Sequence, residues 1–156
     1  MLSTTRLVAI VPVRDHDRAR NFYEQTLGLS PGDAPEPEGV LFSEDGHTGL
    51  QLLLRPDAPV SELTQASFEV SDVEAAVREL EGRGVRFEEY DLPGLRTVDH
   101  VATTEGMRAA WFTDSEGNVL CLHQRTGRAG PGHGRTPAAT RATGVLLIGK
   151  EPGGTT

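Results

Sequence analysis

The sequence has few of the residues that define several common protein classes. Among its 156 residues there is one cysteine, Cys121, so no disulfide can form within the chain and a cytoplasmic setting is expected. No apolar run approaches the roughly 20 residues of a membrane-spanning helix. The start of the sequence lacks the cationic stretch followed by an apolar one that is typical of a secretory signal, so no such signal is expected. Walker and GxGxxG phosphate-binding loops are missing as well. These absences favour a cytoplasmic protein without a membrane partner.

Basic residues are also scarce, and their distribution divides the chain. Fifteen Lys and Arg stand against 23 Asp and Glu, a formal charge of −8, which disfavours nucleic acid as a partner. The last 31 residues hold four basic groups and one acidic group, so residues 1–125 hold 11 basic and 22 acidic groups. This tail, 126–156, is rich in Gly and Pro and is predicted to be mostly disordered.

The hydrophobic pattern alternates between periods of 2 and 3.6 residues, which predicts an α+β fold. Strands are expected over 7–13, 40–43, 50–55, 65–70, 85–90, 96–102, 109–113 and 118–124. Helices are expected after Asp15 and Asp72, because aspartate is a favoured residue at helix N-caps. Alternation along the first strand assigns Leu7 to the face beneath the first helix.

The two halves of the chain form an internal repeat. Four positions of the first half match four of the second at one constant offset: Val11, Val13, Asp15 and Ala19 match Phe68, Val70, Asp72 and Ala76. Each half is interpreted as a strand-helix-strand-strand-strand unit, and one such unit alone leaves a sheet face open, so two must pair. The first unit is expected over 1–58 and the second over 59–125.

Two motifs carry a resemblance to a known family. Phe22-Tyr23 with Leu27-Gly28-Leu29, followed in the second half by residues 111–118 (WFTDSEGN), resemble the vicinal oxygen chelate superfamily of glyoxalases, bleomycin resistance proteins and extradiol dioxygenases. The resemblance covers residues 6–125. It implies two βαβββ modules that form a cupped mixed sheet, and a homodimer with cups at the subunit interface. It implies less about activity, because one scaffold hosts many chemistries.

The resemblance also implies a metal site whose ligands this chain lacks. Metal-dependent members hold a divalent ion with His or Glu at four strand positions, which here are Val8, Gln51, Gln65 and Cys121. Valine has no donor atom, and amides are neutral, weak ligands. No metal and no cofactor are therefore expected. The histidines nearest these strands are His47, His100 and His123.

Strand alternation places a mixed set of side chains on the cupped face. The candidate ligand-binding residues are Gln51, Gln65, Glu69, Trp111 and Cys121, and the same face holds Val8, Ile10, Leu53, Ser67 and His123. Trp111 is interpreted either as a stacking wall or as a core aromatic. The candidate acid–base residues are Glu69, His100 and His123; a solvated position at the rim is the alternative for each.

Two functions follow from these residues. The first is a metal-independent protein that sequesters a small, cationic or aromatic compound, as the resemblance to bleomycin resistance proteins implies. The second is a glyoxalase-like lyase, isomerase or cyclase that uses Glu69, His100 or His123 for acid–base catalysis. A metal-dependent glyoxalase or dioxygenase is least favoured. The acidic body, Trp111 and the missing ligands favour the first.

Overall fold

The computed structural model describes residues 2, 5–32, 39–42 and 48–127. Residues 128–156 and His47 lie outside the described residues, so the predicted disorder of the tail stays a prediction. The first half contains β1 (Leu7–Val13), α1 (His16–Asn21), a π-helical continuation (Phe22–Thr26), β2 (Gly39–Phe42) and β3 (Thr48–Leu54). The second half contains β4 (Thr64–Glu69), α2 (Val73–Gly82), β5 (Asp91–Leu92), β6 (Leu95–Val98), β7 (Val101–Thr104), β8 (Met107–Thr113) and β9 (Val119–Arg125).

The strands form two mixed sheets, which confirms the predicted α+β class. One sheet has the order β1-β3-β2 and the other β4-β9-β8-β7-β6-β5. In both, the strand before the helix pairs in parallel with the last strand of the unit: β1 with β3, and β4 with β9. The internal repeat is therefore visible in the topology. Within the described residues the first unit has three strands, one fewer than the βαβββ pattern.

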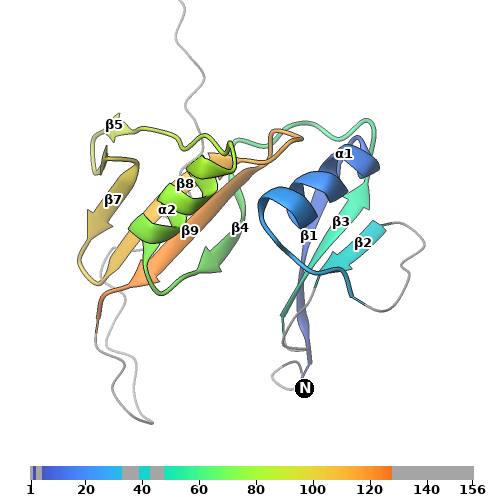
Figure 1. Ribbon diagram of the computed structural model, residues 1–156, viewed down its shortest axis with the longest axis horizontal. Coiled ribbons are helices and arrows are strands. Elements are labelled where there is room, and N and C mark those ends of the chain that lie inside the picture. Colours follow the sequence, from blue (N-terminus) through green and yellow to red (C-terminus); the bar gives the residue numbers. More distant parts are fainter. Residues whose placement is uncertain (1, 3–4, 33–38, 43–47, 128–156) are drawn as a thin grey trace, which may run out of the picture.

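The two helices begin at the residues that the repeat predicts. The Asp15 carboxylate accepts a hydrogen bond from the Arg18 backbone N–H at 2.9 Å, and Asp72 accepts one from Ala75 N–H at 2.9 Å. Each aspartate thus satisfies an N–H that the first helical turn leaves without an intrahelical partner. α1 covers one face of β1 and β3, and α2 covers the same side of the second sheet (Figure 1).

One hydrophobic core joins the two units on the helix side. It contains Val11, Val13, Leu50 and Leu52 of the first sheet, Phe112, Leu120 and Leu122 of the second, and Tyr23, Val73 and Val77 from the helices. β1 and β4 lie at the facing edges of the two sheets (Figure 1). A core shared in this way makes the relative position of the units part of the folded structure.

Three details of the predicted strands are wrong. Leu7 is 76% exposed rather than covered, because roughly 16 Å of helix cannot reach the end of a strand of about 23 Å. The expected strand 96–102 is split by a turn, where Asp99 and His100 have φ angles of 50° and 68°. In the expected strand 85–90, only an isolated bridge joins Phe87 to Phe112.

Candidate functional site

The face of each sheet opposite the helices is the candidate site. Register places Gln51 beside Ile10 and Leu41 in the first sheet. In the second sheet it places Ser67 beside Cys121, and Glu69 beside His123. Neighbours in register point to the same side of a sheet, and residues that alternate with them, such as Leu50, Leu52 and Leu122, lie in the helix-side core, as the predicted alternation requires. We call these surfaces the open face.

The four positions at which the family binds metal do not offer a suitable set of donors. Val8 supplies none, and Gln51 and Gln65 supply only amides; the Gln65 amide donates to the Leu63 carbonyl at 2.9 Å. Cys121 is fully buried, and burial raises the pKa of its thiol to about 11. Its Sγ lies 3.2 Å from the Leu122 carbonyl, to which it donates. A buried, protonated thiol with two amides does not fit a divalent ion. Among the described residues, no group of three or more His, Cys, Asp or Glu is arranged to hold a metal.

A chain of polar side chains runs across β4 and β9 on the open face. The Ser67 hydroxyl lies 2.7 Å from His123 Nδ1, and His123 Nε2 lies 3.9 Å from a Glu69 carboxylate oxygen. The other Glu69 oxygen lies 3.4 Å from Arg125 Nε. A hydroxyl, an imidazole and a carboxylate in this order can move a proton or orient a polar ligand. Glu69 and His123 were candidates from the sequence; Ser67 was assigned to this face but its link to His123 was missed.

His100 does not join this polar chain. Its Nε2 lies 3.1 Å from Glu81, and its Nδ1 lies 2.9 Å from Glu89 but has no hydrogen-bond partner among the described residues, so the ring lies between two carboxylates. Its ring is 6.2 Å from that of Phe87, a residue of the helix-side core. The three candidate acid–base residues are thus divided between two places: Glu69 and His123 lie together, and His100 lies at the turn between β6 and β7.

Trp111 lies on the predicted face but is covered. It is fully buried in a second cluster with Cys121, Leu95, Ala102, Ala109 and Val119, against which Tyr90 and Met107 pack. The Tyr90 ring meets the indole edge-on, with centroids 5.6 Å apart. The indole Nε1 has no hydrogen-bond partner within residues 5–32, 39–42 and 48–127. The interpretation of Trp111 as a core aromatic is confirmed, and its role as a stacking wall for a ligand stays a prediction.

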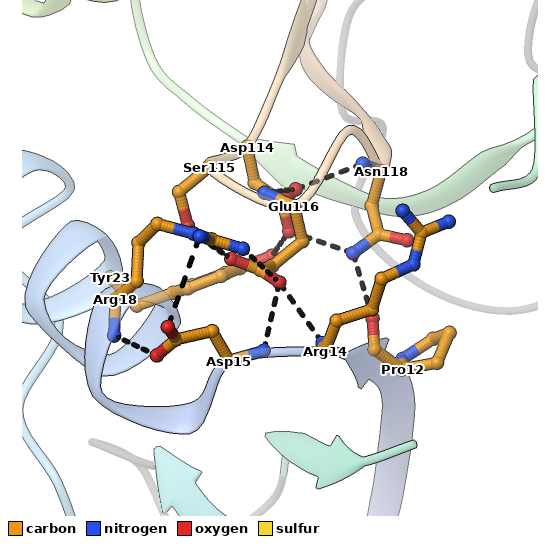
Figure 2. Close-up of polar contacts among 9 residues, drawn as sticks. All are labelled: Pro12, Arg14, Asp15, Arg18, Tyr23, Asp114, Ser115, Glu116 and Asn118. Atoms are coloured by element: carbon orange, nitrogen blue, oxygen red, sulfur yellow. Dashed lines mark hydrogen bonds and ion pairs between the residues drawn. The ribbon is translucent and has the colours of Figure 1, made fainter. Parts of the chain in front are cut away.

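The turn between β8 and β9 holds the two units together (Figure 2). One Glu116 carboxylate oxygen accepts hydrogen bonds from the backbone N–H groups of Arg14 and Asp15 at 3.0 and 3.1 Å, and the other accepts from Arg18 Nε at 2.7 Å. Burial pushes the pKa of Glu116 upward, but the Arg18 side chain and the two backbone donors outweigh it and hold the pKa below 4.5.

Asp114 is the second carboxylate of this turn. It accepts hydrogen bonds from the Tyr23 hydroxyl at 2.7 Å, from the backbone N–H groups of Glu116 and Asn118 at 2.8 Å, and from the Asn118 amide at 2.9 Å. The Asn118 amide also donates to the Pro12 carbonyl at 2.9 Å. No short-range pattern in the sequence predicts that Tyr23 and Glu116 reach across to the other unit. These contacts connect the turn of the second unit to the first unit.

Comparison with known proteins agrees with this geometry. Residues 6–122 match the family described as the Glyoxalase/Bleomycin resistance protein/Dioxygenase superfamily. No curated protein sequence matches the chain. The solved structure of TnmS3, an antibiotic binding protein from Streptomyces sp. CB03234, is 27% identical and has a TM-score of 0.58, covering 81% of this chain and 99% of that one.

Two further solved structures are similar over comparable lengths. A glyoxalase/bleomycin resistance protein from the same Streptomyces strain is 28% identical with a TM-score of 0.57, covering 77% of this chain and 100% of that chain. A member of the superfamily from Sphaerobacter thermophilus DSM 20745 is 25% identical with a TM-score of 0.60, covering 80% of this chain and 100% of that chain.

The described residues contain no helix long and apolar enough to cross a membrane.

Proposed function

We propose that this chain, which belongs to the Glyoxalase/Bleomycin resistance protein/Dioxygenase superfamily, binds a small aromatic or cationic compound on its open face without a metal ion. The observation that carries the proposal is the set of side chains at the four metal positions, Val8, Gln51, Gln65 and Cys121, which lacks any carboxylate or imidazole. The similarity to TnmS3, an antibiotic binding protein, supports a binding role of the bleomycin resistance type.

The polar chain of Ser67, His123 and Glu69 supplies the ligand contacts in this proposal. The Glu69 side chain is 56% exposed, so a ligand can reach its carboxylate, and its negative charge favours a cationic group. The His123 side chain is 14% exposed and can donate or accept a hydrogen bond. The homodimer and the cytoplasmic location expected from the sequence remain part of the proposal.

Metal analysis tests the first part of the proposal. The purified chain is expected to contain much less than one equivalent of Fe, Zn, Ni or Mn, because the four positions offer no adequate donor set. Adding these ions to protein treated with a chelator should leave the melting temperature unchanged. A stoichiometric ion that raises the melting temperature would contradict metal independence.

A ligand panel tests the second part. Planar aromatic compounds with and without a quaternary ammonium group are compared by thermal shift, since a ligand at 100 times its Kd stabilises the folded chain by about 2.7 kcal/mol. Glu69→Gln is expected to weaken binding of the cationic compounds about threefold, the size typical of an exposed charge pair. Glu62→Gln, a change at an exposed loop residue before β4, is the control. Equal binding by both variants would remove Glu69 from the site.

The alternative function is acid–base catalysis by the same polar chain. The 2.7 Å contact between the Ser67 hydroxyl and His123 favours it, because that contact fixes the imidazole beside Glu69. Conversion of a panel compound that is lost in His123→Asn, with binding retained, would support an enzyme over a binding protein.

A further inference from the structure

The side chain of Trp111 is fully buried, and its one polar atom has no partner in the part of the chain that the structure describes. Among the residues that the structure describes, no acceptor meets its enclosed indole N–H, although buried donors in proteins are nearly always hydrogen-bonded. A donor left in this state costs about 1–3 kcal/mol, which an acceptor on a bound molecule would recover. The indole also lies on the open face, in register with Cys121. The indole N–H is therefore suited to donate a hydrogen bond to a ligand, provided that the residues packed over it move.

The cover is the hairpin of β5 and β6, residues 91–98, with Tyr90 at its base. Leu95 and Tyr90 pack in the cluster that encloses Trp111. Few backbone pairs hold this hairpin: β5 pairs with β6 at two positions, and β6 pairs with β7 at two. Asp91, Leu92, Pro93 and Gly94 are exposed, so the outer end of the hairpin packs against little else. Segments with few contacts open at low free-energy cost.

A set of four residues, the Glu89 clasp, fastens the base of this hairpin. Thr97 Oγ1 donates to one Glu89 carboxylate oxygen and accepts from Tyr90 N–H at 2.8 Å. The other Glu89 oxygen accepts from His100 N–H at 3.1 Å and lies 2.9 Å from His100 Nδ1. Glu89 therefore ties Thr97 on β6 to the turn at His100, where the backbone adopts left-handed φ angles that non-glycine residues rarely occupy.

We propose that the β5–β6 hairpin is a gate held by the Glu89 clasp, and that its opening lets Trp111 bind a planar aromatic ligand that carries a hydrogen-bond acceptor. The proposal rests on the proposed function and specifies its ligand class. The ligand takes the place of Tyr90 and Leu95 beside the indole, and an acceptor atom that lies in the plane of the indole accepts a hydrogen bond from Nε1–H. A ligand of the same shape without an acceptor would leave the indole N–H without a partner and bind less tightly.

The gate is tested first without a ligand. Trp111 is the sole tryptophan, so acrylamide quenching of fluorescence reports its access to solvent. Glu89→Gln and Thr97→Val are expected to raise the quenching constant at least about twofold, because both weaken the clasp. Asp91→Asn, on the same hairpin but outside the clasp, is the matched control and should match the wild type. Hydrogen exchange should speed up at residues 91–98 while β8 and β9 keep their protection.

Two results would overturn the gate: unchanged quenching in both clasp variants, or faster exchange spread equally over all strands, which would indicate global destabilisation. Because no ligand is used, this part can fail while the proposed function stands.

The ligand class is tested with two probes of the same shape. Fluorenone carries a carbonyl acceptor and fluorene does not, and their binding to the full chain is compared by equilibrium dialysis. Fluorenone is expected to bind about fivefold or more tightly to the wild type. The preference should disappear in Trp111→Phe, which keeps an aromatic ring but has no N–H. Equal binding of the two probes, binding of neither, or a preference that survives in Trp111→Phe would overturn the ligand class.

Discussion

Replacing Glu116 with alanine is expected to lower the free energy of unfolding by about 3 kcal/mol. The Glu116 side chain is 1% exposed, and its removal leaves the backbone N–H groups of Arg14 and Asp15 without their acceptor. These bonds join the β8–β9 turn to the start of α1, so their loss also loosens the contact between the two units. Urea unfolding followed by circular dichroism measures the effect.

Glu105→Ala is the control for this substitution, because Glu105 is an exposed carboxylate in another turn of the same sheet. It should change the free energy of unfolding by less than about 0.5 kcal/mol. A loss in Glu116→Ala no larger than that of the control would show that this carboxylate does not connect the two units.

The same carboxylate makes the stability of the protein depend on pH in the acidic range. Since hydrogen bonds hold the pKa of Glu116 below the ordinary 4.5 in the folded chain, the folded state binds the proton less readily than the unfolded state. Its contribution to stability is fully present above pH 4.5 and is lost as pH falls through the lower, folded pKa. Glu116→Gln should therefore show a weaker loss of stability than the wild type over that acidic range.

Replacing Trp111 with alanine is expected to cost about 3–5 kcal/mol of stability, the range for truncating a large aromatic residue in a core. The indole is fully buried, and its contacts hold together Leu95, Cys121 and Tyr90. Trp111→Phe keeps most of this packing and removes a donor that has no partner among the described residues. Its loss of stability should therefore be clearly smaller than that of Trp111→Ala. Circular dichroism in urea measures both variants, because the fluorescence signal disappears with the tryptophan.

This difference decides which variant can test ligand binding. Weaker ligand binding by Trp111→Ala could come from a lost contact or from lost folding, whereas Trp111→Phe separates the two causes. A loss below about 1 kcal/mol in Trp111→Ala would contradict a core role for the indole.

Much of the fold could be predicted from short-range patterns. The N-caps at Asp15 and Asp72 follow from the preference of aspartate for that position, and both are observed. The side of the sheet to which Trp111 and Cys121 belong follows from the pleat, which fixes the direction of alternate side chains. The poor donor set at Val8 and the other three metal positions is a matter of residue identity alone.

Other features depend on contacts between residues distant in the chain. Ser67 meets His123 because β4 pairs with β9 in one register, and no local pattern determines that register. His100 lies apart from them because the chain turns at Asp99, where two non-glycine residues take left-handed φ angles. The burial of Trp111 depends on where the β5–β6 hairpin folds.

The sequence by itself thus determined the fold class, the helix starts, the faces of the strands and the lack of metal ligands, since these depend on residue type and on spacing along the chain. Only the tertiary structure decided that Glu69 and His123 lie beside Ser67, that His100 lies between Glu81 and Glu89, and that Trp111 is covered. The physical reason is that strand pairing and the packing of a hairpin bring together residues whose spacing along the chain carries no information about their contact.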